Sequence, residues 1–356
     1  MDKNSIFSSS ATSILDLQSQ HFISIAQIQH MPFNTLPFMS VHRAYKKNLL
    51  KVEEVSEEGN INELLLSNFS NSCILIMDGD ILKGAKQNRV VNTSVLVAPK
   101  AKIIIPVSCV EQGRWAYDGN DFMPSEEVAY RKIREQKNRD IYNNRFNASQ
   151  KHHVDQRRVW DHVGDFLADH GEHSATASYS DAFESKRMNI GRVIDRFKVC
   201  EKANGLGYFI NGKLYGIEIF NREDVYRDYF KRILNSIAMD AVIILRRSNK
   251  VETSRLSDGE ANAAIKDAVA DYNKHLDTVD ACKGVCLGVE HRLITGKEIY
   301  YDLSHNDQTV HQSILNFEKD DSFDGSKNPY FPADPNDRTE MGSRLERAGR
   351  SLSEVL

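Results

Sequence analysis

The chain has 356 residues, of which 40% are hydrophobic and 27% are charged, and its formal net charge is −4 at pH 7. This is ordinary globular composition, and a chain of this length can bury a large core. Because the net charge is slightly negative, we do not expect the chain as a whole to bind nucleic acid or an anionic membrane by electrostatic attraction. No apolar run approaches the roughly 20 residues that cross a bilayer, and no secretory signal opens the chain, so we predict a cytoplasmic protein without a membrane partner. The five cysteines do not suggest a disulfide framework.

The first part of the chain predicts β-structure. Residues 1–20 are polar and rich in serine, which favours a flexible N-terminal segment. Residues 21–120 contain short runs of β-branched and apolar residues, separated by turn residues such as Pro37 and Gly59. The predicted strands are 21–28, 38–45, 61–70, 73–77, 89–99 and 102–110. The last two of these runs resemble a hairpin.

Residues 121–317 predict a helical region followed by a mixed one. Ser125 precedes two glutamates and favours a helix start, and the spacing of apolar residues over 125–169 is helical. Asn211–Gly212 predicts a two-residue hairpin turn. Further predicted helices are 190–202, 223–240 and 258–275, and predicted strands are 241–245 and three runs that start at Gly284, Lys297 and Thr309. Residues 318–356 predict a disordered tail with a short helix. The fold class is therefore α+β, with a β-rich N-terminal half packed against a helical middle and a mixed C-terminal part.

The densest polar segment, MDGDILKGAKQNR, lies between two apolar runs. A turn that contains glycine, lysine and arginine suits phosphate or carboxylate binding, because backbone N–H groups can approach closely and arginine can donate two hydrogen bonds. The segment is not a Walker A loop, since Ala85 stands at the lysine position. The candidate ligand-binding residues are Lys86, Gln87, Asn88 and Arg89. The alternative is a solvated hairpin loop.

A second polar segment, PVSCVEQGRW, ends the most apolar predicted strand. Strand alternation places Cys109 and Glu111 on one face and Ser108 on the other. Cys109 and Arg114 have the spacing of an anion-wrapping cysteine loop, but Glu111 would repel a phosphate there. We therefore expect Cys109 to be buried, without a cationic partner and unreactive. Glu111 is a candidate acid, base or ligand anchor, and the alternative is an ion pair with Arg89 or Arg114.

Metal binding is not indicated by the histidines and cysteines. Five histidines lie within 150–173, but the buried face of that predicted helix is apolar, so we expect a solvated histidine-bearing face. Cys282 and Cys286 form a CxxxC pair without a second pair at ligand spacing. The sequence therefore indicates no metal site, and it does not identify a cofactor.

Taken together and in this order, the two polar segments resemble the domain family associated with ADP-ribosylglycohydrolases (ARG) and the rhodanese-phosphatase superfamily. The resemblance covers roughly residues 20–317 and includes Val159–Asp161 and the segment GKLYGIEIF, while Asp80 replaces an expected glutamate. It implies NAD-derived or ADP-ribose metabolism, without a settled activity. The residues that match the family motifs are Lys86, Gln87, Asn88, Arg89, Ser108, Cys109, Glu111, Arg114 and Trp115.

We therefore expect the chain to process or bind an NAD-derived or ADP-ribose-like nucleotide at one site built from the two segments. In a hydrolase, Lys86 and Arg89 would hold a diphosphate, the two amide side chains between them would orient a ribose or base, Trp115 would stack, and Glu111 would serve as general acid or base. A non-catalytic nucleotide-binding or sensor module is the alternative. A weaker alternative is a phosphatase or sulfur transferase that depends on Cys109. The sequence does not predict the oligomeric state.

Overall fold

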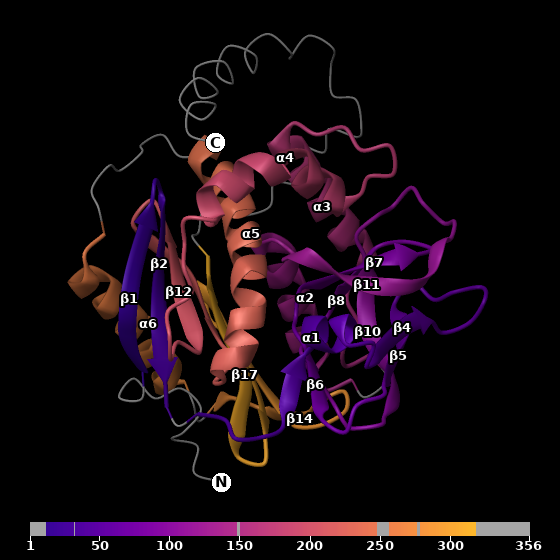
Figure 1. The fold of residues 1–356 in the computed structure, drawn as a ribbon, viewed down its shortest axis with the longest axis horizontal. Helices are drawn as coiled ribbons and strands as arrows, with labels where there is room; N and C mark the ends of the chain where they lie inside the picture. The colour runs from indigo at the N-terminus through magenta and orange to yellow at the C-terminus, as the bar shows by residue number, and fades with distance from the viewer. Residues whose placement is uncertain (1–11, 32, 148–149, 248–255, 276–277, 318–356) are drawn as a thin grey trace.

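The computed structural model describes residues 12–31, 33–147, 150–247, 256–275 and 278–317. These residues form three β-sheets and six helices, with one large sheet on one side, two smaller sheets on the other, and helices between them (Figure 1). The predicted α+β class is confirmed. None of the helices in these ranges is both long and apolar enough to cross a membrane. The predicted tail 318–356 lies outside the described residues.

The large sheet is antiparallel throughout and joins strands from both ends of the described chain. Its strand order is β1 (Thr12–Gln20), β2 (Ile23–His30), β12 (Gly205–Ile210), β13 (Lys213–Ile219), β17 (Gln308–Asn316), β16 (Glu298–His305), β15 (Val289–Ile294) and β14 (Ala281–Lys283). Between β12 and β13, Asn211 and Gly212 both have positive φ, 51° and 77°, as a tight hairpin turn requires. The hairpin that the sequence predicts here is confirmed.

The two smaller sheets contain the polar segments. The six-stranded sheet has the order β11 (Asp118–Val128), β7 (Asp80–Ala85), β8 (Arg89–Val91), β10 (Lys102–Cys109), β5 (Glu63–Asn68) and β4 (Leu50–Glu54). The three-stranded sheet has the order β3 (Phe38–Ser40), β6 (Cys73–Ile76) and β9 (Val95–Val97). The predicted strand 89–99 is therefore two strands in two sheets, and only β8 pairs with β10.

The helices cover the sheets and separate them. They are α1 (Val41–Lys46), α2 (Arg131–Asn144), α3 (Gln156–His170), α4 (Tyr179–Ile194), α5 (Glu223–Arg247) and α6 (Asp258–Lys274). The long helix α5 runs between the large sheet and the small sheets, and it packs on β11, β12 and β3 (Figure 1). Helix α6 covers the outer face of the large sheet over β1 and β13.

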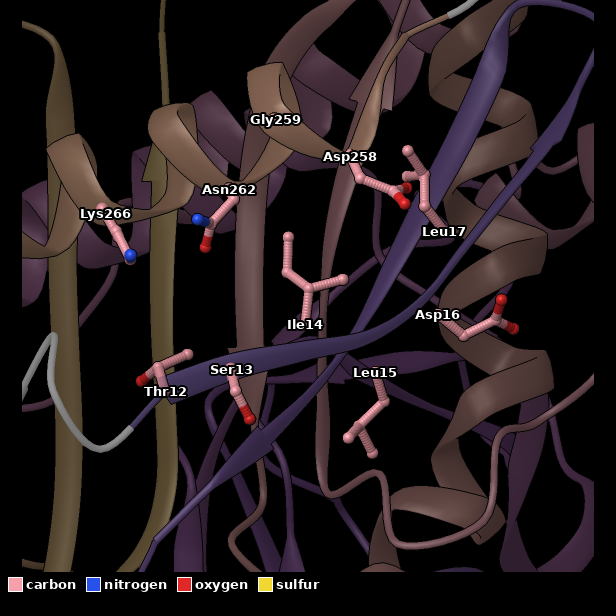
Figure 2. Close-up of a pocket in the computed structure, with 10 residues that line it drawn as sticks. All are labelled: Thr12, Ser13, Ile14, Leu15, Asp16, Leu17, Asp258, Gly259, Asn262 and Lys266. Carbon is pink, nitrogen blue, oxygen red and sulfur yellow. The ribbon is translucent and has the colours of Figure 1, made fainter.

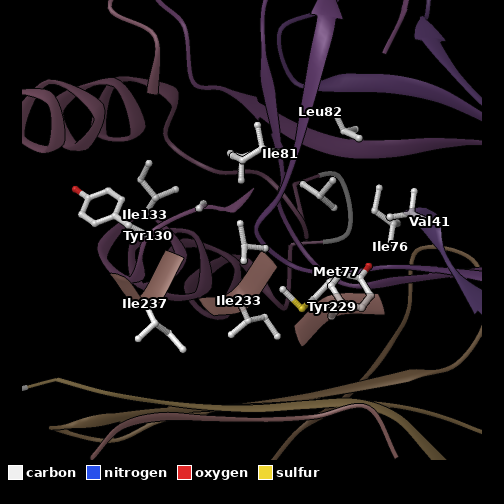
Figure 3. Packing of buried hydrophobic residues seen from close by; sticks show 14 of the residues in the cluster. Val41, Ile76, Met77, Ile81, Leu82, Tyr130, Ile133, Tyr229, Ile233 and Ile237 are labelled. Atoms are coloured by element: carbon white, nitrogen blue, oxygen red, sulfur yellow. The ribbon is translucent and has the colours of Figure 1, made fainter. Parts of the chain in front are cut away.

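The main core forms where α5 meets the small sheets. Tyr229, Ile233 and Ile237 recur at four-residue spacing on α5 and are almost completely buried. Figure 3 shows them grouped with Met77 and Ile81 from the strand region around β7, in the same hydrophobic cluster. This packing fixes the position of the segment that follows β6 and carries the first polar block.

Two predictions for the N-terminal half are wrong. Residues 12–20, predicted to be flexible, form the edge strand β1 and pair with β2. Their polar composition suits an edge position, where one side faces solvent. The predicted strand 38–45 ends at Ser40, whose hydroxyl accepts a 3.1 Å hydrogen bond from the N–H of Arg43 and begins α1.

Three predictions for the middle of the chain are also wrong. Ser125 does not start a helix but lies in β11, which pairs with β7. The run 241–245 is the last part of α5 rather than a strand, because a short apolar run fits a buried helix equally well. Helix α4 ends at Ile194, so the predicted helix 190–202 includes only its last turn.

Candidate functional site

The two polar segments lie side by side in the six-stranded sheet. β8 and β10 pair antiparallel, which sets Arg89 opposite Cys109 and Val90 opposite Ser108. Glu111 follows the end of β10 and forms a bridge with Ser178, just before α4. The backbone therefore brings together the two segments that the sequence analysis singled out.

Glu111 is saturated with hydrogen bonds. Arg114 donates from Nε to Oε1 at 2.9 Å and from Nη2 to Oε2 at 2.7 Å. The Thr176 hydroxyl donates to Oε1 at 2.8 Å, and the N–H of Asn88 donates to Oε2 at 3.1 Å. Burial by itself would raise the pKa of Glu111, but these hydrogen bonds outweigh it and lower the pKa. Glu111 is thus an ionised anchor between the two segments, in the ion pair with Arg114 that the sequence left open.

Arg89 is completely buried. Its Nη1 donates to the carbonyl of Gln87 at 2.9 Å, and its Nη2 lies 3.5 Å from Oε1 of Glu54 at the end of β4. The guanidinium carbon lies 5.8 Å from the ring centre of Trp115 and 5.9 Å from that of Phe122. Burial lowers the pKa of Arg89. We define the Arg89 site as Glu54, Lys86, Arg89, Trp115 and Tyr117.

Exposed aromatic rings form the rim of the Arg89 site. Trp115 is 47% exposed and Tyr117 is 52% exposed. The Lys86 ammonium lies 5.3 Å and 5.2 Å from their ring centres, close enough for cation–π attraction to both. Lys86 also donates to the carbonyl of Glu57, which accepts a 3.2 Å hydrogen bond from the Tyr117 hydroxyl as well. Lys86 is thus fixed between two rings and a loop carbonyl.

Cys109 is buried, as predicted. Its thiol donates to Oε1 of Gln87 at 2.9 Å. Burial raises the pKa of the thiol to about 12, although the nearby Arg89 charge acts in the opposite direction. The expectation of no cationic partner is therefore wrong, but the thiol stays protonated at neutral pH because desolvation dominates. This does not favour a cysteine nucleophile.

The structure does not bring all the predicted residues to the Arg89 site. Asn88 uses its side-chain oxygen to accept from Arg114 at 3.3 Å, and so belongs with the Glu111 ion pair. Ser108 faces away from Cys109, as strand alternation predicts, and donates to Asn92 at 2.9 Å. Ser108 therefore lies on the other side of β10.

A second and larger group of charges lies beneath α2, and the sequence analysis missed it. We define the Asp78 network as Asp78, Ser94, Arg134, Lys137, Asn138, Glu218, Glu290, Arg292 and His311, all of which are buried. Asp78 accepts from Lys137 at 2.6 Å, from Asn138 at 3.0 Å and from Nε of Arg134 at 3.4 Å. Glu218 accepts from Arg134 and, at 2.9 Å, from His311.

The ionisation of this network follows from its pairing. Burial alone would raise the pKa of Asp78, but the charges of Lys137 and Arg134 hold it below the usual value. Burial likewise opposes ionisation of Glu218, and Arg134 again outweighs it and lowers the pKa. Both acids are therefore carboxylates held by buried cations.

Sequence signals for the Asp78 network do exist. Glu218 interrupts an apolar strand at an inward-facing position. Glu290 and Arg292 are two positions apart in another strand, so their side chains lie on the same face. Arg134 and Lys137 recur at three-residue spacing and share one face of α2. A search for charged residues at core positions would have found them.

An open hollow lies elsewhere in the fold, with no residue of either group in its lining. It has a volume of about 490 Å³ and lies between β1 and the start of α6, where Asp258 and Lys266 line it together with Ile14 (Figure 2). None of the predicted site residues lines it. The described part of the chain contains no cluster of three or more histidine, cysteine or acidic side chains that could hold a metal ion.

Comparison with known proteins assigns the chain to a family. One family model matches residues 12–315, and its description is ARPP-1, the ARG and Rhodanese-Phosphatase-superfamily-associated Protein domain. No curated protein and no solved structure matches the chain. The match covers both polar segments and all the described strands except the last residue of β17. The chain therefore belongs to the ARG and Rhodanese-Phosphatase-superfamily-associated Protein domain family.

Proposed function

We propose that the chain binds an ADP-ribose-like nucleotide at the Arg89 site and acts as a nucleotide-binding module. The observation that carries this proposal is the exposed Trp115 ring beside a completely buried guanidinium, that of Arg89. Stacking of a nucleobase on an aromatic side chain typically contributes about 1–3 kcal/mol. A guanidinium behind the ring supplies directed donors for the polar edges of the same ligand.

Binding without turnover fits the two candidate catalytic residues better than hydrolysis does. Glu111 accepts four hydrogen bonds, and its lowered pKa leaves it without a proton to donate at neutral pH. Cys109 is a protonated, buried thiol. The geometry therefore supports roles for both residues in holding the site together.

The choice of nucleotide rests on the family. The resemblance to domains that accompany ADP-ribosylglycohydrolases points to ligands derived from NAD. Within that class, ADP-ribose combines a base that can stack with a diphosphate and two riboses that a charged rim can contact. It is the simplest ligand of the class to test.

Calorimetric titration of the full chain with ADP-ribose tests the proposal. We expect saturable binding, and we expect Trp115→Ala to weaken it about 10- to 100-fold, because the stacking face is lost. Phe69→Ala is the matched control, since Phe69 is also a half-exposed aromatic residue, at 50%. It follows the end of β5 that pairs with the start of β10, whereas the second polar segment lies at the end of β10. Absence of binding, or equal affinity of wild type and Trp115→Ala, would contradict the proposal. Formation of product during the titration would instead favour the hydrolase.

A further inference from the structure

Arg89 and Glu54 keep unused hydrogen-bonding atoms in a buried place. Their side chains are 0% and 3% exposed. Within the described residues, Nε and Nη2 of Arg89 and both carboxylate oxygens of Glu54 have no hydrogen-bond partner, although the two groups attract each other at 3.5 Å. A buried polar group without a partner typically costs about 1–3 kcal/mol. Four such atoms side by side indicate a position that a ligand completes.

The chemistry of the pair restricts which ligand can complete it. Arg89 offers only donors and Glu54 offers only acceptors, so the complementary group must present an acceptor beside a donor. A phosphate would satisfy Arg89 but would be repelled by the Glu54 carboxylate. Adenine has the required pair on one edge, with the ring N7 as acceptor and the amino group on C6 as donor.

We propose that Arg89 and Glu54 recognise the amino edge of adenine, an inference that rests on the nucleotide binding proposed above. Glu54 accepts from the amino group, and Arg89 donates to the adjacent ring nitrogen. Trp115 and Phe122 lie at similar distances from the guanidinium, and Trp115 is the one whose ring reaches the surface. The diphosphate and the second ribose then extend toward Lys86 and Tyr117 at the rim.

A short segment covers this position and must move before adenine can enter. In residues 55–62, Gly59 has φ of +78°, and a Cβ built on it would lie 3.4 Å from both the Glu54 carboxylate and the Trp115 ring. The segment is fastened at the carbonyl of Glu57, which accepts from Lys86 and Tyr117. Two rim residues of the Arg89 site therefore hold the cover, and a ligand that engages them would release it.

The test compares AMP with purine riboside 5′-monophosphate, which lacks the amino group, by calorimetric titration of the full chain. We expect the wild type to bind AMP at least about tenfold more tightly, because the second nucleotide leaves the Glu54 carboxylate unpaired. Glu54→Met should reduce this ratio to within about threefold, since the acceptor is gone. Glu54→Gln keeps the shape and one acceptor and should give an intermediate ratio. This variant replaces Glu54→Met in the test if the methionine variant does not fold. Glu53→Gln, the neighbour that pairs with Lys51, is the control and should leave the ratio unchanged.

The outcomes separate this inference from the proposed function. Equal affinity of the wild type for the two monophosphates, with ADP-ribose binding still dependent on Trp115, would overturn adenine recognition and leave nucleotide binding intact. A ratio that persists in Glu54→Met would overturn it as well. Failure of ADP-ribose to bind the wild type would overturn both.

Discussion

The Asp78 network and the Arg89 site are built from the same kinds of side chain, a buried arginine facing a buried carboxylate, but they use the carboxylates differently. Asp78 and Glu218 accept hydrogen bonds at both of their oxygens. Glu54 accepts none in the described part of the chain. Burial and charge alone therefore do not separate a structural ion pair from a binding site, because the two regions share both properties.

What separates the two regions is the unused hydrogen-bonding capacity of the carboxylates, since both oxygens of Glu54 lack a partner in the described structure. The Asp78 network connects α2 to β13 and β17 across the interior, so its bonds stabilise the packing of the sheets. The Arg89 site borders exposed aromatic rings and leaves donors and acceptors unused. The difference leads to four predictions, which we order by the size of the expected effect.

Lys137→Met should be the most damaging of these changes. It leaves Asp78 as a buried carboxylate without its closest cation, and breaking one partner of a buried ion pair typically costs about 3–5 kcal/mol. Glu54→Gln should lower the free energy of unfolding by less than Lys137→Met does, because it removes the 3.5 Å attraction between Glu54 and Arg89 but no hydrogen bond. Urea unfolding of both variants measures the difference. Similar costs for the two variants would abolish the distinction between the regions.

Asp80→Asn tests a carboxylate that is only half used. One oxygen of Asp80 accepts from the N–H of Met77 and from the Tyr229 hydroxyl, and the other has no hydrogen bond in the described structure. Burial raises the pKa of Asp80 to about 6, so the folded state binds an extra proton between about pH 4 and pH 6. The free energy of unfolding must then fall as the pH rises through this window.

Replacement of Asp80 by asparagine removes this loss of unfolding free energy at high pH. A shift of about two units corresponds to about 3 kcal/mol, so Asp80→Asn should be more stable than wild type by up to this amount at pH 8. The gain should vanish below about pH 4, where Asp80 is protonated in both the folded and the unfolded chain. Thermal unfolding across this pH range measures it. A gain that does not depend on pH would show that the carboxylate is ionised without cost, as in the Asp78 network.

Glu111→Gln separates anchoring from catalysis. The glutamine loses charge-assisted hydrogen bonds to Arg114, so the free energy of unfolding should fall by about 1–2 kcal/mol. Affinity for ADP-ribose should stay within about threefold of wild type, since Glu111 does not face the ligand in the proposed complex. Denaturant unfolding and calorimetry together check this. If turnover of ADP-ribose is found in wild type and lost in this variant, Glu111 is a catalytic residue.

Gly59→Ala should have a modest effect on stability, and its effect on binding tests the segment that covers the Arg89 site. An L-residue at this φ costs about 1–2 kcal/mol, and the strain acts on the covered form of the site. Apparent affinity for ADP-ribose should therefore rise, by up to about tenfold, because the open form becomes more populated. Gly171→Ala is the control, since φ is +66° there and a Cβ has open space around it. Weaker binding by Gly59→Ala alone would mean that the segment helps to hold the ligand.

The sequence predicted the parts of the fold that follow a local rule. The hairpin at Asn211–Gly212, the helix α6 and the side-by-side position of the two polar segments follow from turn chemistry, periodicity and strand order. The end of α5 could not be predicted in this way, because residues 241–245 are apolar on every side and their helical state depends on the packing around them.

The same reasoning explains what was missed in the candidate site. Apolar periodicity does not find the inner face of α2, because Arg134 and Lys137 occupy positions where a core helix ordinarily carries aliphatic residues. Glu54 lies 35 positions before Arg89, and only the six-stranded sheet brings β4 and β8 close enough for the two side chains to meet. The sequence singles out Trp115 and Arg89 because each belongs to a short, dense polar segment.

The pairing of β2 with β12 has a consequence for how the chain is made. Ile28 lies opposite Gly205, so the first hairpin leaves the ribosome roughly 180 residues before its partner strand, a delay of about 10–35 s at ordinary rates of synthesis. During that time the later parts of the chain that pack on Ile23, Ile25 and Ile28 have not been made, although all three residues are buried in the finished molecule. The strand β2 gains its second neighbour only after translation has passed β12, and until then it presents an unpaired, apolar edge to neighbouring chains.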